Sequence, residues 1–135
     1  MSGGLVLKLA PNERVLINGA VIENGDRRTR LSIRTPHTHI LRLADALHPD
    51  EATTPVSRAV LKVQLLLSGD LDPAQGRPAC LAAIEQLSQV VTDADSRRLL
   101  DDATAALLGG SDYHALKALR RLLPREARVL ALVGR

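Results

Sequence analysis

Apolar residues in the first third of the chain recur in short runs that are separated by turn signals. The runs occupy residues 5–9, 14–17, 20–23, 28–34 and 39–43. Asn18-Gly19 lies between two of them, and this pair favours a tight hairpin because a type I′ turn needs positive φ at both central positions. Pro11-Asn12 and Asn24-Gly25 interrupt the pattern at two further points. The pattern predicts five short strands in a small antiparallel barrel or sandwich.

After residue 53 the apolar spacing changes to that of helices. Thr54-Pro55 is typical of a helix start, residues 55–68 carry an apolar stripe, and Gly69 suits the helix end. Further helices are expected after Asp72, Asp93 and Ser111, with a short tail helix over residues 125–133. The fold class is therefore α+β. We expect a β module over residues 1–47 and an α-helical module of about four helices over residues 48–135.

The amino-acid composition limits the classes of protein to which the chain can belong. The chain has 135 residues, of which 45% are hydrophobic and 24% are charged, and this balance is ordinary for one globular unit. No apolar run is long enough to cross a membrane, and the first residues lack the pattern of a secretory signal. Cys80 is the only cysteine, which excludes an internal disulfide. We therefore expect a cytoplasmic protein that has no contact with membranes.

Aromatic residues are almost absent. The chain has no Trp, no Phe and a single Tyr, Tyr113. RNA-binding modules that stack bases on aromatic side chains need several of them. If this chain binds RNA, it must use cations and hydrogen bonds instead.

Positive charge is concentrated at the two ends of the chain. Residues 1–43 carry seven Lys and Arg against three Asp and Glu, residues 44–110 carry five against ten, and residues 111–135 carry six against two. The strand over residues 28–34 places Arg28, Arg30 and Arg34 on one face, while Lys8 and Arg42 lie on the first and last strands. Guanidinium groups on a sheet can bind phosphates and base edges. A solvated face that prevents edge aggregation explains the pattern equally well.

The candidate RNA-binding residues form two sets. The primary set is Lys8, Arg30, Arg34 and Arg42, and the secondary set is Lys117, Arg120 and Arg121 on the fourth helix. For the secondary set, exposure to solvent or pairing with the acidic middle helices is the alternative.

Three features could suggest an enzyme, and each has a simpler explanation. His37 and His39 would share a strand face, but no third metal ligand lies near them in the sequence. The aspartates at a helix start suit capping, and Cys80 lies among small apolar residues that favour a buried, inert thiol. Asp93 and Asp95 are the aspartates at the predicted helix start, and Asp101 and Asp102 complete the cluster that could suggest paired carboxylates. We expect no catalysis, no cofactor and no metal.

Several longer motifs resemble one known family. They are LAPNERVLING at residues 9–19, RLSIRTPHTHILR at 30–42, HPDEATTP at 48–55, EQLSQ at 85–89 and ALKALR at 115–120. Over nearly the whole chain they resemble the FlbT family of flagellar biosynthesis regulators in alphaproteobacteria. That resemblance implies a post-transcriptional repressor that binds the 5′ untranslated leader of flagellin mRNA and promotes its degradation. The resemblance also implies that a second flagellar regulator, FlaF, is a partner. The helical half of the chain offers a surface for binding it.

The β module is also similar to the CsrA family of small RNA-binding regulators, which have five short strands and act as intertwined dimers. This similarity implies RNA contacts on the first and last strands, where Lys8 and Arg42 are the nearest candidates, and it adds a homodimer to the expectations. Leu9 and Ala10 stand where that family has basic residues. The alternative function is a protein-interaction adaptor in flagellar assembly that touches RNA only indirectly.

Overall fold

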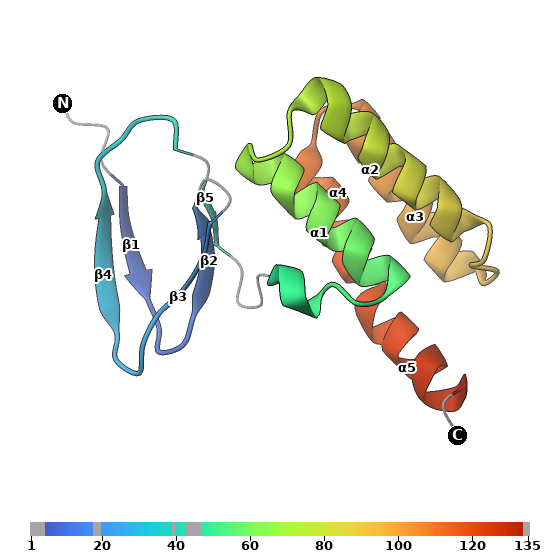
Figure 1. The fold of residues 1–135 in the computed structure, drawn as a ribbon, viewed down its shortest axis with the longest axis horizontal. Coiled ribbons are helices and arrows are strands. Elements are labelled where there is room, and N and C mark those ends of the chain that lie inside the picture. The colour runs from blue at the N-terminus through green and yellow to red at the C-terminus, as the bar shows by residue number, and fades with distance from the viewer. Residues whose placement is uncertain (1–4, 18–19, 39, 43–46, 134–135) are drawn as a thin grey trace.

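The computed structural model describes residues 5–17, 20–38, 40–42 and 47–133. Five strands come first: β1 (Leu5–Leu9), β2 (Arg14–Ile17), β3 (Ala20–Glu23), β4 (Thr29–Ile33) and β5 (Ile40–Arg42). A 3-10 turn, η1 (Pro49–Glu51), leads to the helices α1 (Pro55–Ser68), α2 (Pro73–Ser88), α3 (Ala94–Leu108), α4 (Asp112–Arg120) and α5 (Leu123–Val133). The α+β class and the order of its two parts are as the sequence predicts (Figure 1).

The strands form two antiparallel sheets. β1 pairs with β4, and β2 lies between β3 and β5. Ile17 faces Ala20 across the β2–β3 pair, as a two-residue hairpin requires. Asn18-Gly19 itself lies outside the described residues.

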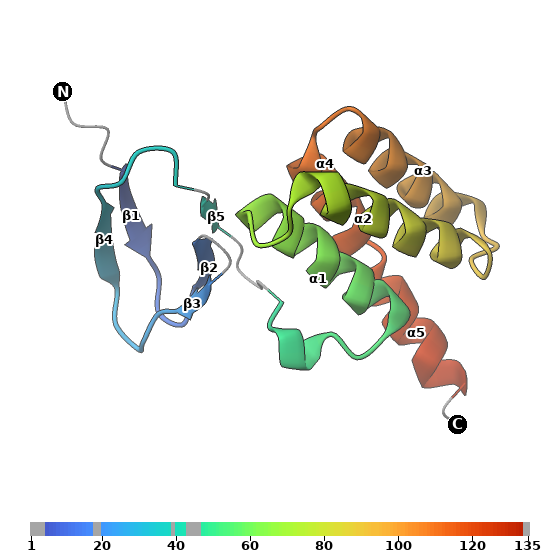
Figure 2. The ribbon, with the colours of Figure 1, turned by 45° about the horizontal axis from the view of Figure 1, so that its top comes forward.

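The sheets pack face to face, and the three-stranded sheet is covered on both faces. Leu7, Leu9 and Val15 form a small core between the sheets. Leu16 and Leu41 face each other across the β2–β5 pair, and both belong to the helical core. The order of layers is therefore the β1–β4 sheet, then the β3–β2–β5 sheet, then the helices, as Figures 1 and 2 show.

α1 lies at the centre of the helices and packs against both α2 and α4, while α3 packs against α2 and α4. Thr54 caps α1 as predicted, because its hydroxyl accepts a hydrogen bond from the Ser57 amide, and Gly69 ends α1 at φ 90°. Asp93 caps α3 in the same way. The helices after Asp72 and Ser111 also begin where predicted, but neither side chain makes a capping bond.

One buried polar side chain joins the chain before η1 to the central helix. The amide group of Gln64, only 1% exposed, donates to the Leu47 carbonyl at 2.7 Å and accepts from the Leu47 amide at 3.1 Å. Both of its polar atoms are therefore satisfied inside the core. This contact holds the chain that leads from the sheets against α1.

Candidate nucleic-acid interface

The outer face of the β1–β4 sheet brings two of the candidate cations together. In the antiparallel register Lys8 lies directly opposite Arg30, and both side chains are exposed. Side chains in such pairs are about 5 Å apart at Cβ, and like charges in this position repel. Neither residue forms an ion pair with a described acidic group. The pair is therefore an uncompensated positive site that an anion would stabilise.

The strand alternation gives this face its composition. Val6 and Ser32 form the next exposed pair along the ladder, while the residues between them on each strand turn toward the neighbouring sheet. Leu7, Leu9, Leu31 and Ile33 are the inward-facing residues. Within β4, Arg30 therefore lies on the exposed face, and Leu31 and Ile33 lie on the face that packs against the other sheet.

A shallow hollow lies at one end of this face. It is lined by Lys8, Leu9, Ala10, Arg28, Thr29, Arg30 and Arg42. Four of these seven residues are cationic, and none is acidic. The structure thus brings Arg28, which the sequence places beside a turn, next to three of the stronger candidates.

Arg42 reaches this hollow from the other sheet and is already bound within the protein. Its Nε donates to Oε2 of Glu13 at 2.7 Å, and its Nη2 donates to Oε1 at 3.0 Å and to the Lys8 carbonyl. The guanidinium of Arg42 and the amide of Ala10 lower the pKa of Glu13, and the Glu13 carboxylate raises the pKa of Arg42. Arg42 therefore joins the two sheets and shapes the hollow, with its charge balanced by Glu13.

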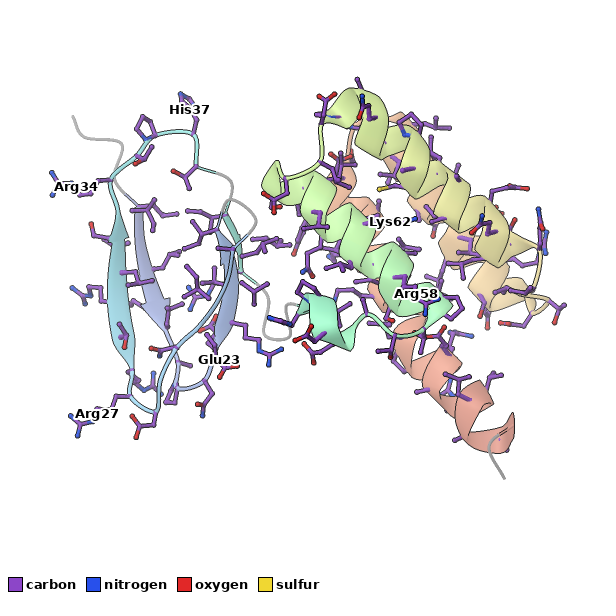
Figure 3. All side chains as sticks on the ribbon, viewed as in Figure 1. Glu23, Arg27, Arg34, His37, Arg58 and Lys62 are labelled. Carbon is purple, nitrogen blue, oxygen red and sulfur yellow. The ribbon has the colours of Figure 1, made fainter. Side chains whose placement is uncertain are left out.

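Arg34 lies just beyond the opposite end of β4. Figure 3 shows it projecting away from the sheet, while Arg27 projects from the turn at the other end of the strand. At about 3.3 Å per residue, Arg34 is about 13 Å from Arg30 along the strand. The outer face therefore carries a line of cations rather than one cluster. The exposed residues on this line are Arg28, Lys8 with Arg30, and Arg34.

The secondary set lies on the helical side of the protein. Lys117 and Arg121 are exposed near the end of α4, and the Lys117 ammonium is 5.7 Å from the centre of the Tyr113 ring. Arg120 is half-buried and lines a separate hollow with Arg14 and Glu51. The three-stranded sheet lies between α4 and the β1–β4 sheet, so the structure does not bring the two sets together (Figure 1).

The residues that could suggest an enzyme do not form a metal-binding group in the described part of the chain. No group of three or more His, Cys, Asp or Glu side chains there could hold a metal ion. His37 is exposed at φ 59°, and His39 lies outside the described residues. Cys80 is buried, which raises the pKa of its thiol.

Sequence reasoning missed Glu13 as the partner that organises the hollow. Glu13 stands in a turn, 29 positions before Arg42, and nothing local indicates their contact. The Ala10-Pro11-Asn12 turn signal was visible, and Glu13 completes that turn by accepting a hydrogen bond from the Ala10 amide at 2.9 Å. The contact with Arg42 depends on how the two sheets pack.

A family model described as "Flagellar protein FlbT" matches residues 5–130. The chain belongs to the FlbT family. The family resemblance seen in the sequence motifs is thus confirmed. No solved structure matches the chain.

Relatives of this chain have consistent names. A "Probable flagellum biosynthesis repressor protein FlbT" of Rhodopseudomonas palustris is 35% identical over 94% of this chain and 98% of its own length. The "Probable flagellum biosynthesis repressor protein FlbT 1" of Bradyrhizobium diazoefficiens is 32% identical over 93% of this chain and 84% of its own length. The "Flagellum biosynthesis repressor protein FlbT" of Caulobacter vibrioides is 39% identical over 46% of this chain and 43% of its own length.

None of the helices in the described ranges is long and apolar enough to cross a lipid bilayer.

Proposed function

We propose that this FlbT-family chain is a non-catalytic, post-transcriptional repressor of flagellum biogenesis. It binds the 5′ untranslated leader of flagellin mRNA in the cytoplasm and promotes degradation of that message. The names of its relatives support the repressor role. The observation that carries RNA binding is the exposed Lys8–Arg30 pair, two like charges held opposite each other without an acidic partner.

The chemistry of the outer face suits a polyanion. Lys8, Arg28 and Arg30 provide a dense positive site, and Arg34 extends the charge along β4. Arg42 holds the edge of the hollow through Glu13 and the Lys8 carbonyl. Phosphate contacts give affinity, while Ser32 and the exposed backbone at the strand edges offer hydrogen bonds to bases. Lys117, Arg120 and Arg121 are a second contact region for a long leader.

Replacing Lys8 and Arg30 together by Gln removes two cations from the outer face and tests this proposal. We expect the affinity of the purified variant for a flagellin leader RNA to fall at least about tenfold at low salt. The plot of log affinity against log salt becomes shallower by about 1.4, because each cation releases about 0.7 counterions from single-stranded RNA. Fluorescence anisotropy titrations over a series of salt concentrations measure both quantities.

The matched control is Arg58→Gln with Lys62→Gln, the same loss of charge on exposed positions of α1. Its affinity for the leader should stay within about twofold of the unchanged protein. Equal losses in both variants would mean that net charge, and not the outer face, drives binding. An unchanged salt dependence in the Lys8 and Arg30 variant contradicts the assignment.

The non-catalytic part of the proposal has its own test. Leader RNA incubated with the purified chain should remain intact on a denaturing gel, with and without divalent cations, while the same RNA decays faster in cells that express the chain. Cleavage by the purified chain that is lost in one of its variants would contradict this part.

A protein-interaction adaptor is the second candidate function, favoured by the exposed apolar residues of α5. In that case FlaF is the first partner to test, and RNA association is indirect. Binding of leader RNA by the purified chain alone separates the two functions. We further expect the chain to form homodimers. Light scattering of the purified protein tests this expectation.

A further inference from the structure

Three large hydrophobic side chains are exposed close together at the end of α5. Val129, Leu130 and Leu132 are 57%, 48% and 64% exposed. α5 packs at its start, where Leu122 and Leu123 join the helical core, and then continues past the bundle, as both ribbon views show (Figures 1 and 2). A helix segment that is apolar on several sides is ordinarily buried. This segment therefore lacks a covering surface.

α5 borders a groove that continues along the bundle. One part of the groove lies between α5, the end of α2 and the starts of α1 and α3. A second part lies between α1 and α2. The two parts share Pro55, Leu87 and Val90, and Val90 is 73% exposed. Together they form one long depression with an apolar floor, the α5 groove.

The two acidic groups that line the α5 groove are already engaged. Asp93 accepts from the Ser96 amide at 2.9 Å and pairs with Arg125. The Glu126 carboxylate accepts hydrogen bonds from the Val56 amide at 3.0 Å and from the Thr54 hydroxyl. It therefore satisfies two donors at the start of α1. Both carboxylates therefore already have hydrogen-bond or ion-pair partners within the protein.

The remaining charge at the α5 groove is positive. Arg58 and Lys62 are exposed one turn apart on α1 and line the groove, where Figure 3 labels both. Neither is paired with a described acidic side chain. Arg128 is exposed beside Val129. The groove thus combines an apolar floor with a basic rim.

We infer that the α5 groove binds an amphipathic helix of another protein, with acidic residues beside its apolar stripe. An apolar stripe at helical spacing fits a groove of this kind, and the acidic flanks meet Arg58 and Lys62. A second copy of the chain is a poor candidate for the partner that occupies the α5 groove. A two-fold interface would place the same basic residues on both sides, where they repel.

The probe for this inference is a stapled helical peptide of about 18 residues, with Leu on one stripe and Glu on both flanks. A second peptide of the same length carries Lys in place of Glu. We expect the full chain to bind the Glu peptide at least about tenfold more tightly than the Lys peptide at low salt, by fluorescence anisotropy. Leu130→Gln with Leu132→Gln weakens binding of the Glu peptide at least about tenfold.

The charge preference has a separate test. Arg58→Glu with Lys62→Glu should reverse the order of the two peptides. Leu108→Gln is the matched control, since Leu108 is 70% exposed at the end of α3, outside the groove, and peptide binding should not change. All of these positions are exposed, so melting curves should show that each variant folds. Leader RNA affinity should stay unchanged in the Leu130 and Leu132 variant.

Three results would overturn the inference. The first is that neither peptide binds, and the second is that both bind equally. The third is a homodimer of the chain that Leu130→Gln with Leu132→Gln dissociates, which would assign the groove to a second copy.

Discussion

The carboxylate of Glu13 connects the two sheets. It accepts hydrogen bonds from the Ala10 amide and from two nitrogens of Arg42, while Arg42 also donates to the Lys8 carbonyl. The side chain of Glu13 is only 13% exposed. Charge-assisted bonds of this kind are stronger than neutral ones. The ionised form of Glu13 therefore stabilises the folded state.

Replacing Glu13 by Gln tests this contribution through its pH dependence. The pKa of Glu13 is lowered in the folded chain, so the unfolded chain takes up its proton first, near the ordinary value of 4.5. The stabilisation is complete above that pH and is lost as the pH falls through the lower, folded pKa. We expect Glu13→Gln to be less stable than the unchanged protein at neutral pH, with a difference that shrinks below pH 4.5.

Urea titrations at a series of pH values measure this difference in the free energy of unfolding. The same substitution at Glu85, an exposed glutamate on α2 without a described side-chain partner, is the matched control. A difference between Glu13→Gln and the unchanged protein that stays constant down to pH 3 contradicts the prediction.

Strand and helix boundaries show what local sequence signals predict well. Thr54-Pro55 and Gly69 mark the two ends of α1, and the observed helix lies between them. The strands begin and end within about two residues of the predicted runs. These signals succeed because capping, turn geometry and periodicity depend on neighbouring residues. α5 begins at Leu123, before the predicted residue 125, and Pro124 lies in its first turn, where a proline is tolerated because the backbone amides there have no partner within the helix.

Contacts between distant residues were not predictable in the same way. The sequence indicated a barrel or sandwich, but not that β1 pairs with β4 while β2 pairs with β5. The Lys8–Arg30 pair and the engagement of Arg42 depend on that strand pairing, and the α5 groove depends on how α5 packs against α1, α2 and α3. The family resemblance pointed to RNA binding, but only the register shows which cations lie side by side.

The start of α2 depends on packing more than on capping. Asp72 makes no side-chain cap, and Gly76 and Pro78 lie inside the helix. Gly76 is buried where a Cβ would lie 2.8 Å from Cβ of Leu71 and 3.3 Å from a methyl group of Leu66. The absence of a side chain at Gly76 therefore lets the first turn of α2 pack closely on the end of α1 and the connection that follows.

Gly76→Ala tests this close approach. In an ordinary helix the change stabilises by about 1 kcal/mol. Here the added methyl group forces Leu71 to move, and overpacking of this kind costs about 1–3 kcal/mol. We expect a net loss of about 1 kcal/mol in the free energy of unfolding, measured with urea. Gly25→Ala, where a Cβ meets nothing within 4 Å, should change stability by less than about 0.5 kcal/mol, and a more stable Gly76→Ala protein contradicts the argument.

At the scale of the whole molecule, Leu16 and Leu41 place the three-stranded sheet and the helices in one core. Arg14 adds a polar connection, since it pairs with Glu23 on β3 and with Glu51 in η1, both at 2.9 Å. A shared core makes the unfolding of its parts cooperative.

Leu16→Ala tests whether the strands and the helices unfold together. Leu16 is 1% exposed, so its truncation should cost about 3 kcal/mol in the free energy of unfolding. NMR signals of Val15 in β2 and Val63 in α1 should lose intensity at the same urea concentration, and the variant should shift both midpoints equally. A shift confined to the strand signals contradicts a shared core.

The order of the layers also determines whether the two proposed ligands can bind at the same time. The outer sheet and the far end of α5 lie on different sides of the molecule, with the middle sheet between them (Figure 1). A transcript on one side leaves the other side open to a helix, so simultaneous occupancy needs no rearrangement. The chain would then act as a tether that brings a protein to the message and raises its local concentration there.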